Sequence, residues 1–113
     1  MNLVIRKADD FMGDFDRQFR WYVVKAGWKI AERYLAAVDE TLERLAEHPE
    51  LGRLRRFRRL ELAGLRSWTV ERPFSRHLVF YRHNEATLEA VRVLPGSRDL
   101  PRRLLQPPGA ADE

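Results

Sequence analysis

Two neighbouring stretches of the chain repeat their apolar residues at three- and four-residue steps, which is the spacing of one helical face. In the first stretch, between Asp9 and Gly27, the apolar positions are Met12, Phe15, Phe19, Tyr22 and Val23. In the second stretch, which His48-Pro49 ends, they are Ile30, Ala31, Tyr34, Leu35, Val38, Leu42 and Leu45. The two predicted helices are joined so briefly that they must run antiparallel as a hairpin. Each has a single apolar face and therefore needs a further layer to pack on.

The remainder of the chain shows the two-residue alternation that is typical of strands. Residues 2–6 form a short β-prone segment, and three more segments follow Gly64, at 66–71, 76–82 and 87–94. Pro73, the turn at 83–86 and Pro95-Gly96 separate or end these segments. The pattern predicts an α+β fold in which the helical hairpin packs on a small sheet.

Both faces of the predicted sheet are apolar. Alternation places Val79, Tyr81, Val91 and Val93 on one face, and we expect them to form the core with Phe15, Phe19, Tyr34, Val38 and Leu42. The same alternation places Leu78, Phe80, Leu88 and Ala90 on the other face. A sheet with helices on one side should be more polar on its second side. Either the C-terminal segment or a partner protein is therefore expected to cover this second face.

Length and composition limit the class of protein. A chain of 113 residues of which 44% are hydrophobic suits one globular domain, which we place at residues 1–104, with a flexible tail at 105–113. The chain has no cysteine, no secretory-signal pattern and no stretch long enough to span a membrane, so we expect a cytoplasmic protein. The net charge of +4 and the pI near 10.0 favour an anionic partner, either nucleic acid or an acidic protein segment.

Arginines dominate the candidate functional residues. The predicted loop at 50–61 contains five of them around Leu54 and Phe57, namely Arg53, Arg55, Arg56, Arg58 and Arg59. These side chains could neutralise phosphates while Phe57 stacks on a base. They could also pair with acidic residues of a protein partner, or the segment could be an ordinary solvated linker.

Four more arginines lie on the predicted strands or just past them: Arg66, Arg82, Arg92 and Arg98. Arginines that converge on a sheet surface could clamp a phosphate and stabilise charge that develops on it. The alternative is that each pairs with a nearby acid or holds the sheet together. His77 and His83 are the histidines of the strands, but neither follows the last strand, where a general base near Arg98 would be useful. The three histidines have no metal-like spacing, so we expect no metal and no other cofactor.

Several motifs along the chain, taken together, resemble those of a known protein family. Ala31-x-x-Tyr34-Leu35, Leu42-x-x-Leu45 and Pro49-x-x-Gly52 are similar to the second helix and following turn of RelE/ParE-type toxins. So are Gly64-Leu65-Arg66, Val79-Phe80-Tyr81-Arg82 and the closing Arg92-Val93-Leu94-x-Gly96-x-Arg98-Asp99-Leu100. The likeness runs from about Ile5 to Leu104, and the closing Gly-x-Arg-Asp-Leu brings the chain nearest to the ParE branch.

The resemblance implies a β-α-α-β-β-β domain with a mainly antiparallel sheet, from a type II toxin–antitoxin pair whose antitoxin neutralises the toxin. ParE-type toxins poison DNA gyrase, so we expect gyrase inhibition. The target would contact Arg98, Arg66, Arg55, Arg56, Arg58 and Arg59, and the antitoxin would cover Leu78, Phe80, Leu88 and Ala90.

Two alternatives stay open. One is a ribosome-dependent mRNA endoribonuclease of RelE type, for which Arg66, Arg82, Arg92 and Arg98 would be the catalytic candidates. The other is a non-toxic relic that only binds an antitoxin. Family members often carry histidine where this chain has Pro95, and no tyrosine or histidine follows Arg98. These departures weaken the ribonuclease interpretation, because a proton donor or base is missing where that chemistry usually places one.

Overall fold

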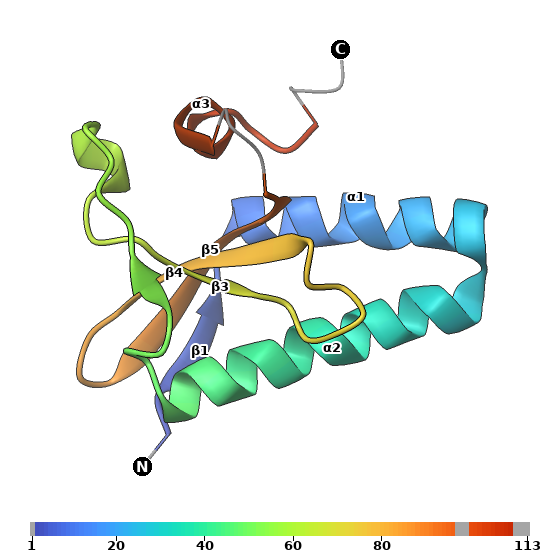
Figure 1. Cartoon of the computed structure of the whole chain (residues 1–113), viewed down its shortest axis with the longest axis horizontal. Coiled ribbons are helices and arrows are strands. Elements are labelled where there is room, and N and C mark those ends of the chain that lie inside the picture. Colours follow the sequence, from blue (N-terminus) through green and yellow to red (C-terminus); the bar gives the residue numbers. More distant parts are fainter. Residues whose placement is uncertain (1, 97–99, 110–113) are drawn as a thin grey trace.

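A computed structural model describes residues 2–96 and 100–109 as a helical hairpin packed on a five-stranded sheet (Figure 1). The elements in chain order are β1 (Val4–Lys7), α1 (Asp9–Ala26), α2 (Trp28–Glu47), β2 (Arg53–Leu54), the 3-10 turn η1 (Leu60–Leu62), β3 (Arg66–Thr69), β4 (His77–His83), β5 (Thr87–Pro95) and α3 (Leu100–Leu105). The predicted α+β fold is confirmed. The strand β2 and the helix α3 were not predicted.

The hairpin turns at Gly27, whose φ of 93° lies in the left-handed region that favours glycine. α1 and α2 run antiparallel and pack together (Figure 1). Tyr34, Val38 and Leu42 of α2 are buried as predicted. On α1 the prediction is wrong for Met12, which is 46% exposed while its neighbour Phe11 is buried. Phe15 and Tyr22 pack against the core as predicted. Leu35 on α2 is also at the surface, whereas it was assigned to the apolar face.

The sheet has the strand order β1-β5-β4-β3-β2. β1 pairs with β5 in parallel, and the other three pairs are antiparallel. The central strands β4 and β5 are joined by a turn in which the Asn84 side-chain oxygen accepts hydrogen bonds from the N–H groups of Ala86 and Thr87, at 2.9 and 2.8 Å. This local bond explains why asparagine suits the position.

A bulge in β5 changes which of its residues face the helices. Phe80 pairs with Arg92 and Tyr81 with Ala90, so Val91 is an extra residue in the ladder. As a consequence Leu88 and Ala90 lie in the core with Tyr81 and the helices, while Val91 packs on the other side of the sheet. The predictions for these three residues are therefore wrong, because strict alternation does not hold across a bulge.

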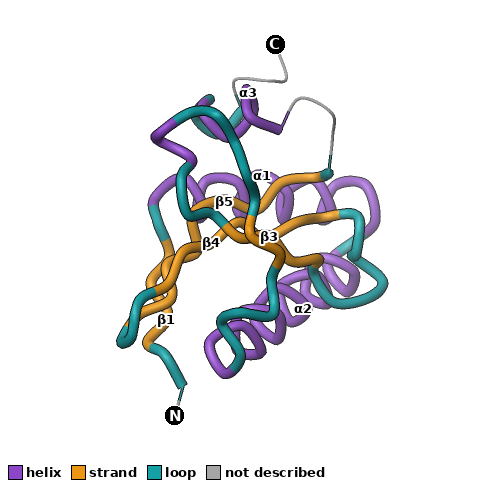
Figure 2. The backbone as a smooth tube through the Cα atoms, turned by 60° about the vertical axis from the view of Figure 1, so that its left-hand side comes forward, coloured by secondary structure: helices purple, strands orange, loops and turns teal. Residues whose placement is uncertain are grey.

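The second face of the sheet is covered by the chain itself. Phe80 is fully buried in a separate cluster with Leu62 of η1, Leu65, Leu94, Leu100 and Leu104. α3 lies beside the η1 segment above this face (Figure 2). Leu78 packs against the same cluster. Two kinds of cover were expected for this face. In the isolated chain, its own C-terminal segment covers the face. Binding of an antitoxin to Leu78 and Phe80 stays a prediction, and it requires α3 to move.

The described part of the predicted tail also has contacts. The Gln106 carbonyl oxygen accepts a hydrogen bond from Arg92 at 2.5 Å. A Cβ atom added to Gly13 of α1 would lie 2.7 Å from the Pro108 ring, so the tail and α1 approach closely there. Residues 106–109 thus run along α1 and form one wall of the groove described below.

Candidate functional site

Arg66 and Arg82 both hold the segment between α2 and β3. The Arg66 guanidinium donates to the carbonyl oxygens of Gly52 and Glu50, at 2.8 and 3.4 Å. Arg82 donates to those of Ala63 and Glu61, at 2.9 and 2.6 Å. These bonds satisfy backbone acceptors that no helix or strand would otherwise satisfy. Both arginines therefore fix the two ends of the arginine-rich loop to the sheet.

Arg92 is almost completely buried, at 2% exposure, in an ion pair with Asp14 of α1. Its guanidinium makes two bonds to the Asp14 carboxylate, at 2.7 and 2.9 Å, and Asp14 also accepts from the N–H of Val93 at 3.2 Å. The remaining donors reach carbonyl oxygens at the end of α3, including that of Leu104 at 3.1 Å. Burial raises the pKa of Asp14 while Arg92 opposes that shift. Arg92 thus joins α1, β5 and the C-terminal segment.

These three arginines bond to three different parts of the chain. Each donates to carbonyl groups or to a carboxylate of its own chain. Arg66, Arg82 and Arg92 therefore fit the alternative interpretation of the sequence, in which the strand arginines hold the sheet together. Arg98 lies outside the described residues.

The arginine-rich loop is a short hairpin stem with an exposed tip. β2 pairs with Arg66 and Ser67 of β3, and Arg55 donates to the Ser67 hydroxyl at 3.2 Å. The Arg55 guanidinium also lies over the Phe57 ring, 5.5 Å from its centre. The Phe57 ring is therefore in contact with Arg55 of the same chain and is not free to stack on a base.

The charged tip of this loop is at the surface. Arg59 pairs with Glu61 at 3.3 Å. Arg56 and Arg58 are exposed, and neither has an ion pair within the part of the chain that the structure describes. Leu60, which follows them, is 87% exposed. Two cations beside an uncovered leucine make this tip a candidate contact surface.

His77, one of the two histidines of β4, lies in the interior of the protein. His77 is buried, and its Nε2 atom lies 3.0 Å from the Tyr22 hydroxyl of α1. Burial, together with the nearby Arg76 charge, lowers the pKa of His77 to about 4. His77 is therefore neutral at pH 7, and its ring packs against those of Tyr22 and Tyr34. It serves as a core residue.

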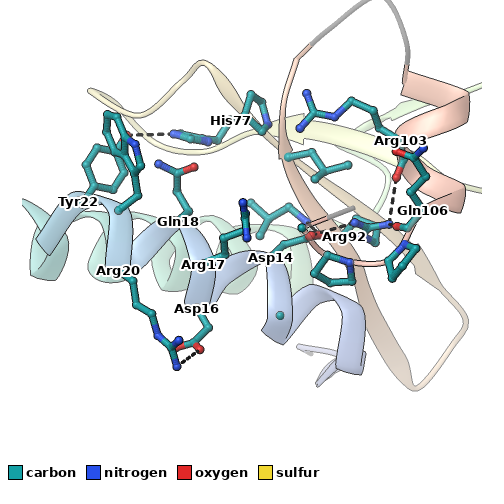
Figure 3. Close-up of a pocket in the computed structure, with 18 of the residues that line it drawn as sticks. Asp14, Asp16, Arg17, Gln18, Arg20, Tyr22, His77, Arg92, Arg103 and Gln106 are labelled. Atoms are coloured by element: carbon teal, nitrogen blue, oxygen red, sulfur yellow. Dashed lines mark hydrogen bonds and ion pairs between the residues drawn. The ribbon is translucent and has the colours of Figure 1, made fainter. Parts of the chain in front are cut away.

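A groove of about 760 Å³ lies between α1, the start of β4, the end of β5 and the C-terminal segment (Figure 3). Its apolar lining includes Trp21, Val24, Val93 and Leu94. Six cationic side chains line it against two carboxylates: Arg17, Arg20, Lys25, Arg76, Arg92 and Arg103, with Asp14 and Asp16. We name this hollow the α1 groove.

The α1 groove was not predicted from the sequence. Its residues come from α1, from the start of β4, and from 103–109, which are far apart in the chain. Of the arginine candidates that the structure describes, only Arg92 contributes to its lining. The available signal was Trp21 and Val24, which are apolar but lie off the predicted buried face of α1 and are 52% and 78% exposed.

Neither a metal centre nor a membrane span is found in the part of the chain that the structure describes. Within residues 2–96 and 100–109, no cluster of three or more histidine or acidic side chains is arranged to hold a metal ion. No helix among the described residues is long and apolar enough to cross a membrane.

A two-helix hairpin packed on a mixed five-stranded sheet places the chain in the α+β class. The family model for the ParE toxin of the type II toxin–antitoxin system parDE matches residues 5–100, and the chain therefore belongs to the ParE toxin family. No curated protein sequence matches the chain significantly.

A solved structure has the same fold. The structure titled "Chromosomal ParDE TA system from P. aeruginosa" matches with a TM-score of 0.68, over 84% of this chain and 97% of that chain. The sequence identity is 18%, so this likeness concerns the fold.

Proposed function

We propose that this toxin inhibits DNA gyrase by binding to it, and that a cognate antitoxin neutralises it. Family membership supports the toxin class. The observation that carries the mode of action is the engagement of Arg66, Arg82 and Arg92 with acceptors of their own chain. A ribonuclease of RelE type would need such cations to be available to a phosphate, beside a group that moves a proton.

Tyr81 and His77, two groups that could move a proton, are also engaged or buried. The Tyr81 hydroxyl donates to the Pro49 carbonyl at 2.7 Å and accepts from the Gly52 N–H at 2.9 Å. His77 is buried against Tyr22. Inhibition by binding needs no such group, and this favours gyrase over mRNA as the target.

We propose the exposed loop tip around Arg56 and Arg58 as the target-contact surface. It is cationic and carries the uncovered Leu60, and it is fixed to the sheet by Arg66 and Arg82. A rigid support lowers the entropy that is lost when a loop binds a partner. Arg55 and Arg59 stabilise the loop from within through Ser67 and Glu61. Arg98 remains a proposed target contact on the basis of the sequence.

The test is a supercoiling assay with purified gyrase, run beside an in vitro translation assay with the same toxin preparation. We expect dose-dependent loss of supercoiling and unchanged translation. Inhibited translation with cleaved mRNA and unaffected supercoiling would favour the ribonuclease alternative. No effect in either assay, with intact binding of the antitoxin, would favour a non-toxic relic.

A further inference from the structure

We propose that the turn end of the helical hairpin binds the surface of an anionic phospholipid bilayer. This end carries Trp21, Val24 and Lys25 near the end of α1, and Trp28 and Lys29 at the start of α2. We call these five residues the hairpin end. Attachment of this kind is confined to the surface of a bilayer and requires no spanning helix. The inference does not rest on the proposed function, because it concerns a different surface and a different partner.

The hairpin end projects away from the rest of the domain. In Figure 1 the turn between α1 and α2 lies at one end of the long axis, and the arginine-rich loop and the β4–β5 turn lie at the other. The turn is made at Gly27, where an added Cβ atom would meet nothing within 4 Å beyond its chain neighbours. A flat surface can therefore approach the hairpin end without first meeting the sheet.

The apolar side chains of the hairpin end are open to solvent. Trp21 is 52% exposed, Trp28 63% and Val24 78%. The Trp21 ring makes an edge contact with Tyr22, at 5.4 Å between ring centres. The Trp28 ring makes a similar contact with Phe19, at 6.0 Å. These contacts support the two indole rings and leave more than half of each tryptophan uncovered. Indole groups favour the boundary between lipid headgroups and acyl chains, because the ring is apolar and its N–H can still be hydrogen-bonded there.

Charge selects an anionic surface. Residues 18–31 contain three cationic side chains and no acidic one, although the whole chain has 17 acidic residues. Of the three, Arg20 is paired with Asp16 at 2.9 Å. Lys25 and Lys29 are exposed, and neither has an ion pair within the described residues. Ammonium groups beside exposed indoles are complementary to the phosphates of an anionic bilayer, and the lysine alkyl chains can lie along apolar surface.

Two other occupants suit the hairpin end less well. Contact between the hairpin ends of two copies would bring Lys25 and Lys29 of both copies together, and these like charges would repel each other. A stable dimer also buries about 800 Å² on each partner, which is more than three partly exposed side chains supply. A single-stranded nucleic acid could stack on a tryptophan, but Val24, the most exposed of the apolar side chains, would gain nothing from a sugar–phosphate backbone.

Neither signal alone would hold the chain firmly on a bilayer. Three apolar side chains bury little surface, and two lysines act only near an anionic headgroup layer. We therefore expect binding that is reversible, that requires both signals, and that weakens as the salt concentration rises.

The test measures binding of the full chain to vesicles of equal parts phosphatidylglycerol and phosphatidylcholine, and to vesicles of phosphatidylcholine alone. Co-sedimentation gives the bound fraction, and tryptophan emission reports insertion of the indoles. We expect binding only to the anionic vesicles, with a shift of the emission to shorter wavelength.

Two variants, each with a matched control, separate the two signals. Lys25→Glu with Lys29→Glu should raise the lipid concentration for half-maximal binding by about tenfold or more. Its control, Arg56→Glu with Arg58→Glu at the other end of the molecule, changes the net charge equally and should raise it by less than about threefold.

The apolar variant is Trp28→Ala, which should raise the same lipid concentration by about fivefold or more and reduce the emission shift. Its control is Leu60→Ala, which removes an exposed side chain outside the hairpin end and should leave binding unchanged. All of the substituted residues are exposed, and unchanged melting temperatures would show that the four variants are folded.

Three outcomes would overturn the inference. The first is that the wild-type chain does not bind anionic vesicles. The second is that each variant binds as its control does, because the attraction would then depend on overall charge rather than on the hairpin end. The third is that the wild type binds single-stranded oligothymidylate, or forms a dimer in analytical ultracentrifugation, and loses that property in Trp28→Ala. Nucleic acid or a second copy of the chain would then be the occupant.

Discussion

Arg92 and Asp14 form a bidentate ion pair between β5 and α1, with N–O distances of 2.7 and 2.9 Å and side-chain exposures of 3% and 4%. The pair is separated by 78 residues in the chain. Because Arg92 also reaches the carbonyl groups at the end of α3, one buried cation holds the first helix, the last strand and the C-terminal segment in a fixed arrangement.

Removing one partner of this pair should be strongly destabilising. In Arg92→Met, the Asp14 carboxylate would be buried without its counter-ion, and we expect a loss of about 3–5 kcal/mol in the free energy of unfolding. The double variant Asp14→Leu with Arg92→Met should lose less than the sum of the two single losses, by about 1 kcal/mol or more. Urea denaturation of the four proteins measures both quantities. Strictly additive losses would show that the two side chains are not coupled.

Removal of the hydroxyl group should lower the free energy of unfolding clearly at one buried tyrosine and hardly at the other. Tyr81 bonds to Pro49 and Gly52, so Tyr81→Phe would leave a carbonyl and an N–H unpaired and cost about 1–3 kcal/mol. The Tyr34 hydroxyl is buried and has no hydrogen-bond partner among the described residues. Tyr34→Phe should therefore change stability by less than about 0.5 kcal/mol or raise it. Both variants lose only a phenolic hydroxyl, so their free energies of unfolding can be compared directly by urea denaturation. Equal losses of stability in the two variants would contradict the hydrogen bonds of Tyr81.

Leu42 on α2 tests the placement of the helix face. It is 1% exposed, and Leu42→Ala should cost about 2–5 kcal/mol through lost burial and the resulting cavity. Leu35 on the same helix is 38% exposed, and Leu35→Ala is the matched control, with an expected cost below about 1 kcal/mol. Thermal or urea denaturation would measure both. A cost below about 0.5 kcal/mol for Leu42→Ala would show that the face is misplaced.

His77 should make stability depend on pH. Burial lowers its pKa in the folded chain to about 4 from the ordinary value of 6.5, so between these two pH values the unfolded chain binds more protons. The contribution of His77 is therefore complete above pH 6.5 and is lost as the pH falls towards 4, by at most about 3 kcal/mol.

His77→Gln isolates this effect, since glutamine can bond to Tyr22 but does not titrate. Urea denaturation at several pH values should give a shallower dependence for the variant between pH 4 and 6.5. Parallel curves for the wild type and the variant would mean that His77 titrates normally in the folded chain.

The sequence was sufficient for the elements that depend on local pattern. The helical hairpin, the strand segments after Gly64 and the buried face of α2 all follow from spacing, which one chain displays directly. The predicted faces hold for Leu78 to Tyr81 on β4 and for Val93 on β5, but not for Leu88, Ala90 and Val91. The extra residue Val91 breaks the alternation along β5, and a bulge has no reliable signature in a single sequence.

The site was harder to predict because it depends on tertiary contacts. The arginines of β3, β4 and β5 looked alike in sequence, but their roles follow from carbonyl groups at Gly52, Ala63 and Leu104 that only the folded chain brings near. Asp14 likewise lies within an apolar helical pattern, which does not reveal its pairing with Arg92. The α1 groove is lined by segments that are about 80 residues apart in the chain.

The central claim is that the toxin acts on gyrase through the tip of the arginine-rich loop, without catalysis. Its most direct test is the dose dependence of gyrase supercoiling inhibition for the wild type, for Arg56→Glu with Arg58→Glu, and for the control Lys29→Glu with Arg33→Glu. We expect the loop variant to need about tenfold more protein or higher for the same inhibition, with an unchanged melting temperature, and the control to match the wild type. Equal inhibition by all three proteins would contradict the loop as the contact surface, and absence of inhibition by the wild type would contradict gyrase as the target.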